Sequence, residues 1–223
     1  MTLAPFVNIR KPRIAFLDWD GTFCDSKESI YDINLTMAKH YGVTMPSFED
    51  WLKSAHPGVE PCMRSIGVTE DREAINAFFH DLLVAQREKG LQNPLYPGAE
   101  ELLAYFQEAG IPAVIISRHL HEHLVLDIKA HGLTQYFHQI IGEPGGEDLR
   151  KDVVMREVCF GQLSVVRKHT FYLGDTVHDM KLARKAGVVP IAVTHGYDPR
   201  SRLEAAQPDY IFDSMPELLE QLQ

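Results

Sequence analysis

Short apolar runs alternate with helical patterns through most of this chain, and that alternation limits the folds it can adopt. Six runs are apolar and β-branched, as buried strands are: 13–18, 112–117, 139–142, 169–174, 189–194 and 209–212. Their apolar residues are continuous, which indicates burial on both faces, as in a parallel sheet. From about residue 95, helical patterns that end at glycines such as Gly132 and Gly187 separate the runs. The sequence therefore predicts an α/β fold with a doubly wound, mainly parallel, Rossmann-like sheet.

One long stretch interrupts the alternation. Residues 25–94 contain no convincing strand, but apolar side chains fall on one helical face around Ile30 to Tyr41 and again from Ile75 to Leu83. We expect the second stripe to form a helical core, and a cofactor-binding stripe is the alternative. The predicted organisation is an α/β core domain, residues 1–24 and 95–223, with a small all-helical domain, residues 25–94, inserted after the first strand.

Charge and composition restrict the partners. The 223 residues include 22 basic and 31 acidic side chains, a net charge of −9. Such an acidic chain is a poor match for nucleic acid, although one positive side chain and a metal ion can still bind a small phosphate ester. The three cysteines form no CxxC pair, and the apolar runs are far shorter than a membrane span. We expect a cytoplasmic protein with no nucleic-acid or membrane partner, and the sequence leaves monomer and homodimer open.

Acidic side chains follow two of the predicted strands. Asp18 and Asp20 end the first run before Gly21, and Asp175 and Asp179 follow the fourth. Since open α/β sheets bind ligands at the carboxyl ends of their strands, we expect these carboxylates to converge. The alternatives are a plain turn for the first pair and helix capping for the second. Converging carboxylates would repel one another unless a cation lies among them, and hard oxygen ligands suit Mg²⁺.

Other polar side chains are candidates for phosphate or metal contacts. Ser117 ends the second run before a predicted helix, where hydroxyl and N–H groups bind phosphate, and a plain helix cap is the alternative. Lys151 could neutralise a phosphate and an aspartate together, although most lysines are merely solvated. His119, His121 and His123 resemble a metal cluster on paper. On a helix only the pair four residues apart would share a face, so a solvated helix start is the preferred interpretation.

In this order the motifs resemble those of the haloacid dehalogenase-like (HAD) hydrolase superfamily. They are Asp18-Trp-Asp20-Gly-Thr, Ser117, Lys151, and Gly174-Asp-Thr-Val-His-Asp179. The tail from Ala186 through His195-Gly196-Tyr197 to Pro208-Asp209 is similar to phosphoglycolate-phosphatase-type members, and the helical insert looks like the cap domain of one subclass. The resemblance implies Mg²⁺-dependent hydrolysis of a small phosphorylated metabolite through an aspartyl-phosphate intermediate.

The resemblance also implies roles for individual residues. Asp18 would be the nucleophile and Asp20 the general acid and base. Ser117 and Lys151 would hold the transferring phosphate. Mg²⁺ would be bound by Asp18, Asp175 and the backbone carbonyl of Asp20, with Asp179 direct or through water. The cap would exclude water and read the leaving group. Its expected specificity loop runs from His56-Pro-Gly58 through Arg64. Lys53, His56 and Arg64 could contact a substrate or be solvated surface residues.

Two positions depart from the family pattern. Arg118 stands where such members often have asparagine, and it could read a second anionic group of the substrate or be a surface arginine. The frequent Lys-Pro pair is Lys151-Asp152 here, which leaves Arg150 as an alternative to Lys151. Two functions besides a phosphatase remain open: a phosphosugar mutase that uses the same site, and a catalytically silent binding protein.

Overall fold

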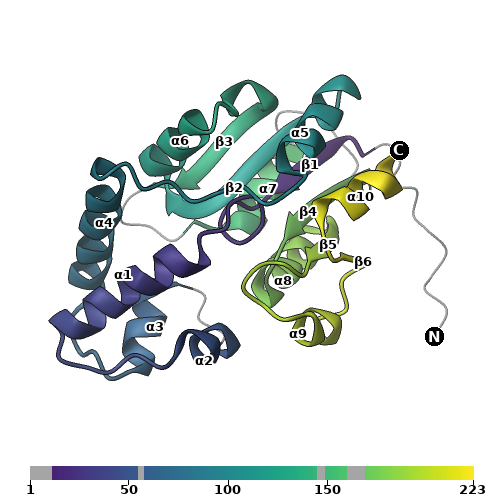
Figure 1. Ribbon diagram of the computed structural model, residues 1–223. Coiled ribbons are helices and arrows are strands. Elements are labelled where there is room, and N and C mark those ends of the chain that lie inside the picture. Colours follow the sequence, from purple (N-terminus) through teal and green to yellow (C-terminus); the bar gives the residue numbers. More distant parts are fainter. Residues whose placement is uncertain (1–11, 55–57, 145–148, 160–168) are drawn as a thin grey trace. The chain divides into compact units, whose positions relative to one another are not determined.

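Six strands form one sheet in the computed structural model, which describes residues 12–54, 58–144, 149–159 and 169–223. In spatial order they are β3 (Phe137–Glu143), β2 (Ala113–Leu120), β1 (Ile14–Leu17), β4 (Thr170–Gly174), β5 (Val189–Val193) and β6 (Tyr210–Phe212) (Figure 1). All neighbouring strands pair in parallel. This confirms the predicted doubly wound α/β fold. The strand order reverses between β1 and β4, which is where sheets of this kind bind ligands.

Helices cover both faces of the sheet. One face packs against α5 (Ala99–Glu108), α6 (His121–Ala130) and α10 (Met215–Leu222). The other packs against α7 (Lys151–Glu157) and α8 (Val177–Ala186), and α9 (Arg200–Ala205) lies against α8 and β5. A short 3₁₀ turn, η1 (Thr134–Tyr136), precedes β3. Burial on both faces explains why the strands are continuous apolar runs in the sequence. The sequence patterns indicated α5 to α8, but not α9 or α10.

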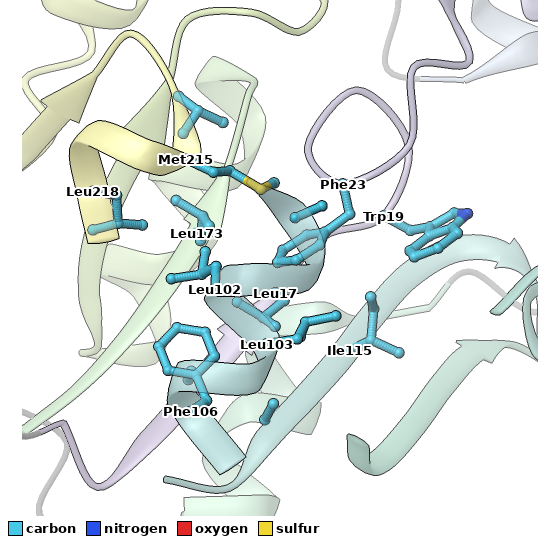
Figure 2. Close-up of a cluster of buried hydrophobic side chains, with 14 of the residues drawn as sticks. Leu17, Trp19, Phe23, Leu102, Leu103, Phe106, Ile115, Leu173, Met215 and Leu218 are labelled. Atoms are coloured by element: carbon cyan, nitrogen blue, oxygen red, sulfur yellow. The ribbon is translucent and has the colours of Figure 1, made fainter. Parts of the chain in front are cut away.

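The larger hydrophobic cluster shows how β1 directs its side chains. Leu17 and Trp19 both lie in this cluster, where they join side chains of α5, β2 and α10 (Figure 2). Phe16 lies in the cluster on the opposite face. Since alternate residues of a strand point to opposite faces, Asp18 points away from Leu17 and Trp19.

Strand β2 is longer than the sequence predicted. The apolar run ends at Ile116, but pairing with β3 resumes at Leu120, opposite Glu143, after a shift in register. Ser117 and Arg118 therefore lie within the strand, and α6 begins only at His121. The expectation that a helix follows Ser117 directly was wrong, because pairing with β3 overrides the local polar pattern.

The chain divides into two compact units, Met1–Cys24 with Leu95–Gln223, and Asp25–Pro94. In its described residues the second unit consists of α1 (Lys27–His40), α2 (Phe48–Lys53), α3 (Val59–Ser65) and α4 (Arg72–Glu88). Its buried side chains include Ile33 and Met37 of α1, Met63 of α3 and Ile75 of α4. The predicted apolar stripe of α4 thus contributes to a helical core, with Ile75 fully buried. In the described part of the chain, no helix combines the length and the apolar character that a membrane span requires.

Candidate active site

Asp18 and Asp20 leave the carboxyl end of β1 on either side of a buried tryptophan. Trp19 is fully buried, and Asp18 is 8% exposed. The side chain of Asp20 retains 28% exposure. Gly21 adopts a φ of 77°, and a Cβ at this position would collide with the carboxylate of Asp175. The glycine is therefore needed both for the turn and for the close approach of this loop to the end of β4.

Asp175 follows β4 and is fully buried. The hydroxyl of Thr22 donates to its Oδ1 at 2.8 Å, and the backbone N–H of Tyr197 donates to its Oδ2 at 2.7 Å. Gly196 lies so close that a Cβ there would clash with the same carboxylate. Asp175 is thus held by one hydroxyl and one backbone amide from two other loops, which fixes its orientation.

Asp179 performs two tasks at once. It completes a capping box at the start of α8, in which its Oδ2 accepts from the backbone N–H of Thr176 at 3.2 Å. Its Oδ1 accepts from Lys151 Nζ at 3.2 Å and from the hydroxyl of Tyr172 at 3.1 Å. The sequence offered helix capping and a functional carboxylate as alternatives. The structure shows the cap, and the same side chain also lies in a buried acidic group.

Lys151 joins the two acidic segments. Its side chain is 2% exposed, and Nζ donates to Asp18 Oδ1 and to the Tyr172 hydroxyl at 2.8 Å each. Burial alone would lower the pKa of this ammonium, but Asp179 and Asp18 outweigh burial and raise the pKa above its ordinary value. Lys151 is therefore charged. The side chain of Arg150, the alternative at this position, is 65% exposed.

Helix α7 is anchored next to this lysine. Asp152 is 2% exposed, and its Oδ2 lies 3.0 Å from Lys185 Nζ of α8 and 3.1 Å from Arg156. Asp152 thus ties α7 to α8, and this tie fixes the backbone from which Lys151 projects.

The three buried carboxylates have opposed electrostatic environments. Burial raises the pKa of Asp18 to about 6, although Lys151 lowers it in part. Burial, with Asp179 and Asp18 nearby, holds the pKa of Asp175 well above its usual range. The pKa of Asp179 is lowered despite burial, because Lys151 and the Thr176 hydroxyl stabilise its charged form. The cluster therefore carries more negative charge than Lys151 can neutralise near neutral pH.

These carboxylates form a group that fits a metal ion. One oxygen from each of Asp18, Asp175 and Asp179 lies within 4.8 Å of the others. Such a set of hard oxygen donors suits a divalent cation like Mg²⁺. The Asp20 carboxylate, which the sequence placed near them, is not part of this group. It contacts His119 instead, with Nδ1 3.1 Å from its Oδ2.

Strand β2 contributes the remaining candidates. Ser117 is 2% exposed and comes two residues after Ile115, which pairs with Leu17 of β1. Arg118 is exposed, but its charge acts on the pKa values of Lys151 and Asp179. The guanidinium therefore lies near enough to the cluster for its charge to be felt there.

The three histidines do not form a solvated helix start as a group. The His119 side chain belongs to β2 and is only 8% exposed. His121 is exposed, and its Nδ1 accepts from the backbone N–H of Gly142 at 3.3 Å. His123 is half-buried beside His119, with 6.3 Å between ring centroids. The preferred interpretation was therefore wrong for His119, because the strand continues past Arg118.

The candidate contacts of the helical unit are engaged within that unit. Lys53 pairs with Asp50 at 2.9 Å, and Arg64 pairs with Glu60 at 3.0 Å. Residues 55–57, which include His56 and the start of the expected specificity loop, lie outside the described residues.

Sequence reasoning missed several groups that build this site: the side chains of Thr22, Tyr172 and Asp198 and the backbone N–H of Tyr197. Asp198 supports the start of α8, since its Oδ2 accepts from the Val177 N–H at 2.7 Å. Tyr172 lies inside an apolar strand and reads as a core residue. The local sequence pattern does not predict these contacts, because their partners are distant in the sequence.

Removing the Tyr172 hydroxyl should destabilise the protein. In Tyr172→Phe, a buried ammonium loses an acceptor and Asp179 loses a donor, which should reduce the free energy of unfolding by about 1.5–3 kcal/mol. Urea unfolding measures the change. Tyr105→Phe is the matched control, since the Tyr105 hydroxyl donates to the carbonyl of Leu222 and its loss should cost about 1 kcal/mol. Equal losses in both variants would contradict a special role for the Tyr172 contacts.

Known proteins resemble this chain in sequence and in fold. A family model for haloacid dehalogenase-like hydrolases matches residues 15–193. A phosphoglycolate phosphatase from Rhodobacter capsulatus is 27% identical over 216 residues, which cover 94% of this chain and 97% of that protein. Pyrophosphatase PpaX from Bacillus mycoides is 25% identical, covering 94% and 96%. The crystal structure of a predicted phosphatase from Clostridium acetobutylicum has the same fold, with a TM-score of 0.82 at 22% identity and coverage of 95% and 98%.

Proposed function

Because the chain belongs to the haloacid dehalogenase-like hydrolase family, we propose that it hydrolyses a small-molecule phosphate monoester through a phosphorylated Asp18. The observation that carries this proposal is the contact of Asp18 with Lys151 inside a buried group of three carboxylates. Two relatives of nearly full length are named as a phosphoglycolate phosphatase and a pyrophosphatase, and both names describe the hydrolysis of phosphate compounds.

In the first step an oxygen of Asp18 attacks phosphorus. The bond from phosphorus to the ester oxygen breaks, and Asp20 gives its proton to that leaving oxygen. Lys151 holds one oxygen of Asp18 at 2.8 Å, so the nucleophile is fixed before substrate arrives. Ser117, Lys151 and Arg118 bind the phosphate oxygens, where their hydroxyl and positive charges offset the charge of the transferring group.

In the second step water attacks the phosphorus of phospho-Asp18. Asp20, now a carboxylate, takes a proton from this water, the bond from phosphorus to the Asp18 oxygen breaks, and inorganic phosphate leaves. Asp18 and Asp20 return to their starting forms. Asp20 suits both steps because its carboxylate lies outside the buried group of three carboxylates and is partly exposed.

The group of three carboxylates formed by Asp18, Asp175 and Asp179 fits the Mg²⁺ that the family implies. Asp18, Asp175 and the backbone carbonyl of Asp20 would hold it, with Asp179 as a further contact. Both oxygens of Asp179 already accept hydrogen bonds, which favours a contact through water. When bound, Mg²⁺ supplies positive charge that offsets the phosphoryl oxygens. The helical unit, residues 25–94, serves as a cap that excludes water and selects the leaving group.

Phosphate release from a panel of compounds tests this function. The panel holds carboxylated monoesters such as phosphoglycolate, sugar phosphates, aryl phosphates and inorganic pyrophosphate, each with and without Mg²⁺. We expect metal-dependent release from at least one monoester. Conversion of one phosphosugar isomer into another without release of phosphate would instead indicate a mutase. No reaction with any compound would favour a silent binding protein.

A further inference from the structure

His119 bridges two carboxylates at the edge of the candidate site. Its Nδ1 lies 3.1 Å from Oδ2 of Asp20, and its Nε2 lies 3.4 Å from Oδ2 of Asp127. The three side chains come from the loop after β1, from β2 and from α6. The imidazole is 8% exposed, whereas the two carboxyl groups are 28% and 29% exposed. A buried ring thus connects two carboxyl groups that solvent reaches in part.

We propose that His119 is a positioning residue that orients Asp20 for proton transfer, and that Asp127 in turn orients His119. This inference rests on the proposed function, because it names the residues that support Asp20, the general acid of that function. In the proposed orientation the ring holds Oδ2 of Asp20, and Oδ1 carries the proton for the leaving group. The role of Asp127 follows from geometry, because a flip of the ring would replace both nitrogens by carbons and lose both contacts.

The support matters because Asp20 lies in the loop after β1, outside the regular pairing of the sheet. Its backbone forms an isolated bridge to Cys24. A general acid must lie within hydrogen-bond reach of the oxygen that it protonates, and a misplacement of about 1 Å can cost on the order of 100-fold in rate. His119 contributes rigidity from a paired strand, which a loop carboxylate lacks.

The dependence of rate on the leaving group tests the proposal. The ratio kcat/KM reports steps up to release of the alcohol, so it isolates the step in which Asp20 donates its proton. An alkyl phosphate needs that proton, whereas p-nitrophenyl phosphate releases a stable anion and needs it far less. In His119→Ala we expect kcat/KM to fall about 10- to 100-fold for alkyl esters and less than about threefold for p-nitrophenyl phosphate.

Conservative variants locate the effect on the ring. The amide of asparagine can reach the position of Nδ1, and that of glutamine the position of Nε2. His119→Asn should therefore retain more activity on alkyl esters than His119→Gln. Asp127→Asn should show the same leaving-group pattern with a smaller loss. In an Asp20→Asn background, His119→Ala should add no further loss that depends on the leaving group.

A matched control and the opposing results complete the design. His121→Asn changes an exposed histidine two residues away and should leave kcat/KM unchanged for every ester. An equal loss for alkyl and p-nitrophenyl esters in His119→Ala would show a merely structural role and overturn the proposal. The proposal is also overturned if the wild type is active and His119→Ala leaves kcat/KM unchanged for every ester. If the wild type hydrolyses no ester, the proposed function itself fails, and this inference falls with it.

Discussion

Replacing Asp18 by asparagine should reduce phosphate release by a factor on the order of 10⁴ or more. The amide has almost the shape of the carboxylate, but it is uncharged and does not form the phosphorylated intermediate. The fold should survive, because Lys151 keeps Asp179 and Tyr172 as acceptors. Phosphate release and detection of a phosphoryl adduct by mass spectrometry measure the effect.

The same variant has an expected effect on stability. Burial raises the pKa of Asp18 to about 6 in the folded protein, above its ordinary value of 3.8. Ionised Asp18 therefore costs folding free energy at neutral pH in the absence of metal, on the order of 3 kcal/mol. Metal-free Asp18→Asn should be at least as stable as the wild type at pH 7.5. Asp209→Asn, at an exposed position of the same unit, is the control and should change neither phosphate release nor stability. Turnover of Asp18→Asn near the wild-type rate would refute the assignment of Asp18 as the nucleophile.

The strands could be predicted because burial leaves a local signature. The inner strands β2, β1, β4 and β5 lie between two layers of helices, so their buried residues form continuous apolar runs that can be recognised without knowledge of their partners. The end of β2 could not be predicted. Residues 117–119 are polar, and only the pairing of Leu120 with Glu143 of β3 extends the strand past them. Such a contact between distant segments has no trace in the local pattern.

The acidic residues of the site were predictable for a topological reason. Asp18 and Asp175 follow strands β1 and β4, which are neighbours in the sheet, so their carboxylates meet at one edge. Tyr172 was not predictable, because a tyrosine in an apolar strand normally belongs to the core. Its partners Lys151 and Asp179 come from two helices on the same face of the sheet, and only the folded structure brings them to its hydroxyl.

Removing divalent metal should stop turnover and lower the melting temperature, and the loss of stability should grow with pH. In the metal-free protein, folded Asp18 and Asp175 hold protons that the unfolded chain releases above pH 3.8. Stability therefore falls as pH rises from about 4 through 6. Asp179 acts in the opposite sense, because its lowered pKa gives stability that is lost only as pH falls below 3.8, outside this window.

Magnesium should replace these protons at neutral pH. At a concentration of 100 times its dissociation constant, a bound ion stabilises the folded protein by about 2.7 kcal/mol, or about 5–10 °C for a chain of this size. Thermal unfolding of protein freed of metal with EDTA, with and without added Mg²⁺, measures the shift. We expect a larger shift at pH 7.5 than at pH 5, where protons already neutralise the cluster in part. Added Mg²⁺ should also restore phosphate release.

The pH dependence and one variant together assign the metal to the buried cluster. Exposed carboxylates elsewhere on this acidic chain are ionised at both pH 5 and pH 7.5, so a metal bound to them would raise the melting temperature about equally at both. Such a metal would also bind Asp175→Asn as well as the wild type. A metal held by the cluster should give a shift that grows with pH, disappears in Asp175→Asn and persists in the exposed control Asp209→Asn. Turnover that survives EDTA would contradict this assignment. A shift in melting temperature that is independent of pH and of Asp175 would also contradict it. Asp175 is fully buried, so its negative charge depends on the bound ion.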